Sequence, residues 1–327
     1  MLTVHRLHRL LALASLLLIA SITDVAAEEA VFLSEPKMLQ EHGAGEGPVW
    51  HPKLGLLTSG EGNINRRDLS GKTSIYREGA GTNGLLFDRR GRLVVCDNVR
   101  RQITRIDPDG TATVLTKSYE GQRYNQPNDL AIDSKNRIYF TDPQYGKRSG
   151  MEIRDRDGRE IEGVYRIDPD GSVVRIIAHE VDRPNGLIVT PDDKYLFVAD
   201  NNNSLGGARK LWRFALDGYG MPDLASQTLI HDWKTTRGPD GMKLDQQGRL
   251  YVAAGLNKPH LPQETADPPT AGIYVFSAAG KLIDFVAIPR DETTNCGFGG
   301  EDGKTLFVTA GGSLWSIQTA VPGYQIR

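Results

Sequence analysis

Six polar residues recur along this chain at the same point of a repeated pattern, each just ahead of an apolar segment. They follow one another at intervals of 37, 45, 57, 55 and 55 residues and are Glu46, Asn83, Asn128, Asn185, Asp240 and Asn295. All six carry a carboxylate or amide oxygen, and none is Ser, Thr or Lys. Oxygen ligands of this kind suit hard divalent cations. The set therefore predicts a cation site, provided that the fold brings the six residues together.

The residue types in this set indicate which cation it would bind. The absence of His and Cys among the six favours calcium and disfavours zinc, copper and iron. Glu46 and Asp240 supply two negative charges, which match a divalent ion, and the amides add neutral dipoles. Calcium is the first prediction, with Mg²⁺, Mn²⁺ or, less suited to these ligands, Zn²⁺ as alternatives. A different interpretation is turn chemistry alone before each strand, which has most force for Asn83 and Asn295.

The segments that follow these residues predict how they come together. In the clearest copy, strands near 84–87, 93–97, 103–107 and 111–115 give a four-stranded antiparallel meander. Six such units in series predict an all-β fold, a six-bladed β-propeller whose first strands line the central channel. The competing fold is a two-sheet sandwich, which does not require the same residue type before every fourth strand. Residues 30–39 are expected to supply a closing strand for the last blade.

The second strand of each repeat returns to the face that carries the six residues, because neighbouring strands are antiparallel. The connections that leave these strands are long and polar and cover residues 143–162, 201–209 and 256–271. Long loops gathered on one face often form a binding site. The loop residues expected to contact a hydroxylated substrate are Tyr145, Asn201, Asn202 and His260.

Charge and motif content exclude several classes of protein. The 327 residues include 39 basic and 41 acidic side chains, for a net charge of −2, with no block of like charge. This balance argues against nucleic acid or a membrane surface as a partner. The chain has no GxSxG nucleophile elbow, and its seven His residues form no zinc motif. A small molecule is therefore the expected partner.

Residues 1–27 resemble a cleaved secretory signal peptide. Two arginines precede an apolar run over residues 10–22, and Val25 and Ala27 have the spacing of a signal-peptidase site. An uncleaved anchor is the alternative, but the run is shorter than the roughly 20 residues of a membrane-spanning helix. The prediction is a secreted or periplasmic protein with one propeller domain over residues 28–327.

The two cysteines test the assignment of the repeats. An exported chain meets an oxidising compartment, so a disulfide between Cys96 and Cys296 has to be considered. The two residues fall in the second and sixth repeats, which are not neighbours in a ring of six. We therefore expect two buried free thiols.

Taken together, these segments resemble the gluconolactonase family, also called the regucalcin or senescence-marker-protein-30 family. The resemblance covers residues 46–317 and rests on EGPVW, PNDLAID, YFTDPQYG, RPNGL, GPDGM and TTNCGFGGEDGKTLFVTAGGSLWSI. It implies a six-bladed propeller in which a catalytic divalent metal, frequently calcium, serves lactone hydrolysis. By their motifs, Glu46, Asn185 and Asp240 would hold this metal, with Asn128 as a fourth ligand or a substrate contact.

The resemblance also implies roles for single residues. Asp240 would activate the attacking water or, as proposed for phosphotriesterase relatives, act as a nucleophile. Some members carry an Arg two places before the Asn of the third blade to contact a sugar lactone, and this chain has Gln126 there. That departure leaves the identity of the lactone open. The residues predicted to contact substrate are Asn83, Gln126, Asn128, Asp142, Tyr145 and Asn295.

The expected function is therefore a calcium-dependent lactone hydrolase. Two alternatives remain open. One is a hydrolase of phosphotriesters or fluorophosphates with the same metal site. The other is a noncatalytic propeller that uses the metal for rigidity and its loops to bind a sugar or a protein.

Overall fold

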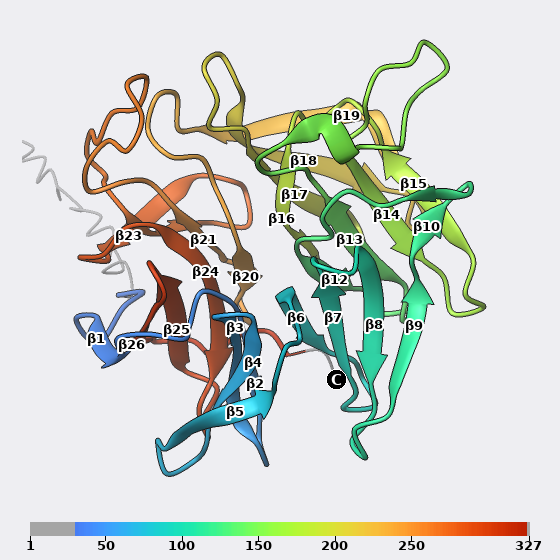
Figure 1. Ribbon diagram of the computed structural model, residues 1–327. Coiled ribbons are helices and arrows are strands. Elements are labelled where there is room, and N and C mark those ends of the chain that lie inside the picture. The colour runs from blue at the N-terminus through green and yellow to red at the C-terminus, as the bar shows by residue number, and fades with distance from the viewer. Residues whose placement is uncertain (1–29, 326–327) are drawn as a thin grey trace, which may run out of the picture. The chain divides into compact units, whose positions relative to one another are not determined.

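The six repeats fold into six four-stranded antiparallel sheets that stand around a common centre (Figure 1). The computed structural model describes residues 30–325, and contacts divide the chain into residues 1–30 and a second unit, from Val31 onward, that holds every sheet. The predicted all-β six-bladed propeller is confirmed. No helix of the described part is long and apolar enough to cross a membrane. The signal peptide predicted for residues 1–27 lies outside the described residues and stays a prediction.

Successive sheets are built from consecutive strands, and the first strands of neighbouring sheets contact one another around the channel. In sheet order the strands are β2 (Glu46–His51), β3 (Gly55–Gly60), β4 (Asn63–Arg67), β5 (Thr73–Arg77); β6 (Thr82–Phe87), β7 (Leu93–Asp97), β8 (Gln102–Ile106), β9 (Ala112–Thr116); β12 (Leu130–Ile132), β13 (Ile138–Asp142), β14 (Gly163–Ile167), β15 (Val173–Ile177); β16 (Pro184–Val189), β17 (Tyr195–Asn201), β18 (Arg209–Leu216), β19 (Pro222–Asp232); β20 (Met242–Leu244), β21 (Leu250–Ala254), β22 (Gly272–Phe276), β23 (Leu282–Ala287); and β24 (Thr293–Gly299), β25 (Thr305–Ala310), β26 (Ser313–Gln318), β1 (Lys37–Gln40). A short hairpin, β10 (Ser118–Tyr119) with β11 (Gln122–Arg123), lies between the second and third sheets. One 3₁₀ turn, η1 (Arg148–Gly150), lies in the loop between β13 and β14 of the third sheet.

The ring is closed by a strand from the beginning of the described chain. β1 pairs with β26, with Met38 opposite Trp315, and completes the sixth sheet. The expectation of a closing strand is thus confirmed, although the strand occupies only the last part of residues 30–39 and continues to Gln40. This pairing joins an early and a late segment of the described chain in one sheet and so closes the ring.

Both cysteines of the chain are among the described residues, and both are free and buried. Cys96 lies on β7 and Cys296 on β24, in the second and sixth sheets. The prediction of two buried thiols is confirmed, and each packs within an apolar cluster of its own.

A buried ion pair recurs at the turn between the first and second strands. Asp245 Oδ1 accepts hydrogen bonds from the backbone N–H groups of Gln247 and Arg249, both at 2.9 Å. Its Oδ2 accepts from Arg249 Nε at 2.6 Å and from Tyr251 Oη at 3.2 Å. Asp133 makes the same four contacts in the third sheet. These carboxylates fix the turn geometry and are fully paired, as buried charges must be.

Replacing Asp245 by Ala should strip a buried arginine of its partner and open the turn. Loss of one member of a buried ion pair typically costs about 3–5 kcal/mol, so we expect a fall of this order in the free energy of unfolding by urea. Asp68 makes the same two backbone contacts in a surface turn, and Asp68→Ala is the matched control with a much smaller effect. Equal losses in the two variants would show that the buried ion pair adds nothing.

Candidate functional site

A cavity of about 500 Å³ opens at the mouth of the channel where the first strands begin. All six sheets contribute side chains to its wall, which consists mostly of carboxylates and amides. Five of the six predicted residues line it, namely Glu46, Asn83, Asn128, Asn185 and Asp240. The repeat pattern therefore identifies a set of residues that the fold brings to one place.

The sixth predicted residue, Asn295, does not line the cavity but supports it from below. Its side chain is buried, and its Nδ2 lies 3.0 Å from Glu46 Oε2 and 3.4 Å from Asp129 Oδ2. Asn295 therefore bridges the buried carboxylate of Asp129 and the half-buried carboxylate of Glu46. The sequence predicts a contact between Asn295 and substrate, but this position favours a supporting role beneath the cavity.

Two of the amide oxygens are buried without a partner. Asn185 donates from Nδ2 to Tyr145 Oη at 2.8 Å, which fixes the orientation of its amide. The Oδ1 atoms of Asn185 and Asn83 have no hydrogen-bond partner among the described residues. A buried acceptor is rarely left unpaired in a folded protein. Oxygens held in this way next to carboxylates fit a bound cation.

The carboxylates of the site lie close to one another in a largely desolvated place, which disfavours their charged forms. Burial and the nearby charges of Glu46, Asp129 and Glu292 raise the pKa of Asp240 well above its ordinary value. Burial also raises the pKa of Glu46, and the charge of Asp129 adds to this effect. Like charges buried together favour protonation or a bound cation. The site is thus built to accept positive charge.

The donor set determines what kind of cation could bind. Across residues 30–325, no group of three or more His, Cys, Asp and Glu side chains is arranged to hold a metal ion. Any ion at this place would therefore depend on amide oxygens as well as on Glu46 and Asp240. Neutral and anionic oxygens in combination fit calcium better than the softer transition metals.

The glycines that follow these polar residues are required for close approach between sheets. A Cβ on Gly241 would lie 1.9 Å from Asn295 Cγ, and one on Gly186 would lie 2.1 Å from the carbonyl oxygen of Asp240. Neither has a positive φ. Glycine here admits the first strand of the next sheet, so turn chemistry alone does not explain these pairs.

The other predicted contacts divide into those at the cavity and those away from it. Gln126 and Tyr145 line it, and Tyr145 N–H donates to Gln126 Oε1 at 2.8 Å. Asn201 lines it as well, whereas Asn202 donates to Asp182 outside it. His260 stands behind the wall, with Nδ1 3.1 Å from Glu292 Oε1.

Asp142 was predicted to contact substrate, but the structure places it beneath the surface. Its side chain is fully buried, and Oδ2 accepts the N–H of Asn125 at 2.8 Å while Oδ1 has no partner among the described residues. Burial raises the pKa of Asp142 to about 8. This environment fits a neutral carboxylic acid that holds the neighbouring loop in place better than it fits a contact between Asp142 and substrate.

Sequence reasoning missed the charged side chains of the wall. Arg183, Arg237 and Glu292 line the cavity, and Arg237 Nη1 lies 2.7 Å from Glu292 Oε1. A charged residue in a loop is ordinarily a solvated surface group, so residue type alone did not single these out. The position of Arg183 in the repeat could have indicated a role. Arg183 stands two places before Asn185, just as Gln126 stands two places before Asn128.

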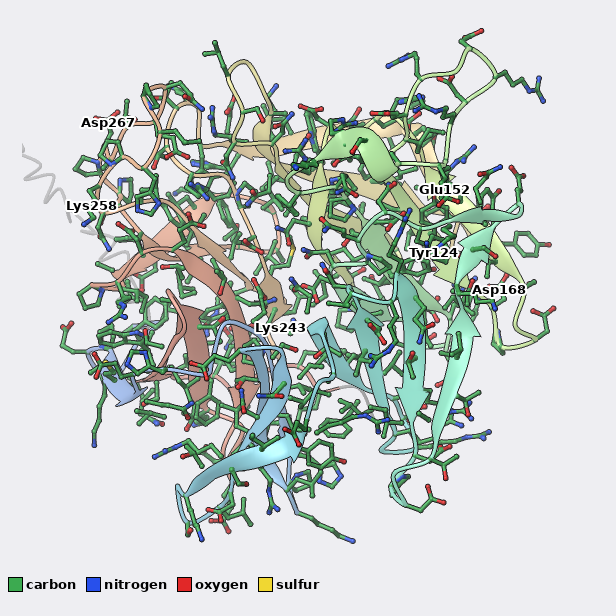
Figure 2. All side chains as sticks on the ribbon, in the orientation of Figure 1. Tyr124, Glu152, Asp168, Lys243, Lys258 and Asp267 are labelled. Carbon is green, nitrogen blue, oxygen red and sulfur yellow. The ribbon has the colours of Figure 1, made fainter. Side chains whose placement is uncertain are left out.

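A second missed pair lies deeper on the channel. Asp129 is buried beside Asn295, and Lys243 lies near the middle of the ring in Figure 2. Burial raises the pKa of Asp129, and the positive charge of Lys243 partly offsets this rise. Asp129 directly follows the predicted residue Asn128, and Lys243 lies three places after Asp240. Neither occupies the repeated position that the pattern selects.

Comparison with known proteins identifies the family. The family described as SMP-30/Gluconolactonase/LRE-like region matches residues 44–312. A gluconolactonase of Zymomonas mobilis is 32% identical over 257 residues, which cover 76% of this chain and 65% of that protein. The chain thus spans just under two thirds of the length of this relative.

Two solved structures share the fold. A gluconolactonase from Xanthomonas campestris superimposes with a TM-score of 0.71 at 30% identity, covering 87% of this chain and 89% of that one. The calcium-binding protein regucalcin from Agrobacterium tumefaciens gives 0.68 at 17% identity, covering 90% of this chain and 96% of its own. The second likeness shows the fold alone. The resemblance predicted from the motifs is confirmed.

Gly241→Ala should disturb the inner ring at Asn295. Because the new Cβ has no room, we expect loss of about 1–3 kcal/mol in unfolding free energy, as for other overpacked interiors. Gly218→Ala is the control, since nothing lies within 4 Å of the place that a Cβ on Gly218 would take. Thermal unfolding of both variants checks this, and a wild-type transition for Gly241→Ala would contradict the packing argument.

Asp142→Asn should change how stability depends on pH. The folded pKa of about 8 lies above the unfolded value of roughly 4, so the acid contributes full stability below pH 4 and loses it as the pH rises through 8. Asparagine mimics the neutral acid and has no such loss. Urea unfolding between pH 4 and 9 should therefore show the variant gaining on the wild type with rising pH. Parallel curves would contradict the assignment.

Proposed function

Since this chain belongs to the SMP-30/gluconolactonase/LRE-like family, we propose that it is a lactone hydrolase that uses a divalent cation, calcium before others. The observation that carries the proposal is the convergence of Glu46, Asp240 and the unpartnered Oδ1 of Asn185 at the floor of one cavity. The names of its relatives support lactone chemistry. The donor set supports the cation.

Four residues would hold the cation. Glu46 and Asp240 provide the charge, Asn185 provides a preoriented amide oxygen, and Asn128 serves as a fourth ligand or as a contact to substrate. When bound, a divalent cation polarises a carbonyl and stabilises the oxyanion that develops on it. Fixed donors arranged before substrate arrives need no reorganisation during the reaction.

The side chains of the protein supply proton transfer and orientation. Asp240 accepts a proton from the water whose oxygen forms a bond to the lactone carbonyl carbon. The ring C–O bond then breaks, and the leaving alkoxide takes up that proton to give a hydroxy acid. Burial and the charge of Asp240 raise the pKa of Tyr145 well above its ordinary value. Tyr145 therefore stays neutral and keeps Asn185 in place.

Removal of the cation and replacement of Asp240 test this function together. After treatment with chelator, acid release from glucono-1,5-lactone should fall to the rate of spontaneous hydrolysis measured without protein and should recover with added calcium. Asp240→Asn keeps an oxygen ligand but loses the base, so kcat should fall by about 10²- to 10⁴-fold. Calcium should raise the melting temperature of the wild type, because a ligand that binds only the folded state stabilises it.

Other outcomes of the same assay would favour the alternatives. Hydrolysis of phosphotriesters or fluorophosphates without turnover of any lactone would replace the lactonase with that activity. Calcium-dependent stabilisation without hydrolysis of either class would favour a noncatalytic propeller. Entry of ¹⁸O from labelled water into the carboxylate of Asp240 during a single turnover would identify Asp240 as a nucleophile, because a general base forms no bond to the oxygen of the water.

A further inference from the structure

Arg183 brings a guanidinium group to the wall of the cavity. It lies directly before β16, two residues ahead of Asn185, and its side chain is 13% exposed. The cavity is lined by both Arg183 and Asn185. Arg183 therefore contributes a cationic side chain to the cavity wall close to Asn185.

The guanidinium is held from behind by one buried carboxylate. Arg183 Nε donates to Glu162 Oε2 at 2.9 Å, and Nη2 donates to Glu162 Oε1 at 3.3 Å. Glu162 also accepts a hydrogen bond from the backbone N–H of Gln144 at 2.8 Å and forms an ion pair with Arg148. Paired contact with a carboxylate fixes the plane of the guanidinium. Nη1 makes no hydrogen bond to any described residue and remains available as a donor.

The neighbouring side chains make this wall rigid. The Cζ atom of Arg183 lies 5.5 Å from the centre of the Tyr145 ring, a distance at which a cation interacts with an aromatic face. The backbone of Tyr145 is bound to Gln126, and its hydroxyl to Asn185. Arg183, Tyr145 and Gln126 therefore form a preorganised surface that joins the floor of the cavity.

The charges around Arg183 indicate the type of group that it binds. Glu162 is shared between Arg183 and Arg148, and Glu292 in the cavity wall is paired with Arg237. Glu46 and Asp240 are the carboxylates that would hold the proposed cation. A hydroxyl oxygen can accept a hydrogen bond from Nη1 without bringing a further charge into this balanced set.

We propose that Arg183 is a specificity-determining residue that donates a hydrogen bond to a ring or side-chain hydroxyl of the lactone, and that Glu162 is its positioning residue. This inference rests on the proposed lactonase function for its substrate class. According to this inference, the side chains on the loop side of the cavity select a polyhydroxylated ring over a ring without hydroxyls. The residues at the floor of the cavity act on the carbonyl group that reacts.

Arg183 also separates two cavities, which governs the choice of variant. A second cavity of about 560 Å³, lined by Glu162, Arg148 and Arg159, has Arg183 in its wall as well. Truncation to Ala would join the two spaces and change the shape of the site. Arg183→Met keeps most of the volume and removes the donors, so it isolates the hydrogen bond.

The test compares glucono-1,5-lactone with δ-valerolactone, a ring of the same size without hydroxyls. Arg183→Met should lower kcat/KM for the hydroxylated ring by about 10- to 100-fold, the range expected for a hydrogen bond from a charged group. The loss should lie mainly in KM, and turnover of δ-valerolactone should change little. Glu162→Gln should produce the same selective loss to a smaller extent. Arg183→Lys should recover part of it.

Arg154→Met is the matched control, because Arg154 lies on the loop that carries Glu162 and binds Glu160 at the surface. It should leave the ratio of the two substrates unchanged. Equal losses of both substrates in Arg183→Met, or no loss, would overturn the inference. Equal losses would instead indicate a role in the fold or in cation binding.

A binding measurement separates this inference from the proposed function. Glucono-1,5-lactam presents the same hydroxyls without a hydrolysable ester, and calorimetry should show weaker binding to Arg183→Met than to the wild type by a similar factor. If the lactam binds in this way while no lactone is hydrolysed, the proposed function fails and the role of Arg183 stands. If the wild type does not bind the lactam, or the variant binds it equally well, the inference is wrong.

Discussion

The repulsion between carboxylates buried on one axis is the interaction on which the rest of the site depends. Burial raises the pKa of both Glu46 and Asp240; the charge of Asp129 adds to the rise in both, and the charge of Glu46 adds to it in Asp240. Transfer of such groups from water is costly unless each finds compensation. Compensation comes from the amide of Asn295, from the charge of Lys243 and from oxygens that are free to share a cation. Stability and the proposed affinity for a cation would therefore depend on the same residues.

Only a closed ring can impose this arrangement. The first strand of each sheet reaches the axis because the sheets are packed around it, and their close approach needs glycine where the next strand passes, as at Gly186 and Gly241. An open array of the same sheets would let the carboxylates move apart. Pairing of β1 with β26 is thus a condition for the site as well as for the fold. The unfavourable free energy of burying like charges is offset by favourable packing elsewhere, in the turns and between the sheets.

The periodic part of this design could be predicted from the sequence, and the aperiodic part could not. Repetition reveals six sheets and the residue at the head of each, because one position performs the same task six times. It also predicts the face on which the long loops meet. Asp142 shows the limit of that reasoning: the end of its strand lies on the predicted face, but the side chain turns into the support of the loop. Whether a polar side chain points into a cavity or beneath it depends on packing that has no signature in spacing.

Arg183 was missed for a related reason, and its place explains how one scaffold can accept different rings. The residues at the floor stand on or beside the inner strands, whose positions are fixed by contacts with both neighbouring sheets. The wall, by contrast, depends on a loop that is tied to the scaffold through Glu162 and Tyr145. A change of one wall side chain alters the hydrogen bonds offered to substrate without moving the carboxylates of the floor. Selection of substrate can therefore vary while the chemistry at the axis stays constant, which is the physical basis for placing specificity in loops and catalysis on rigid strands.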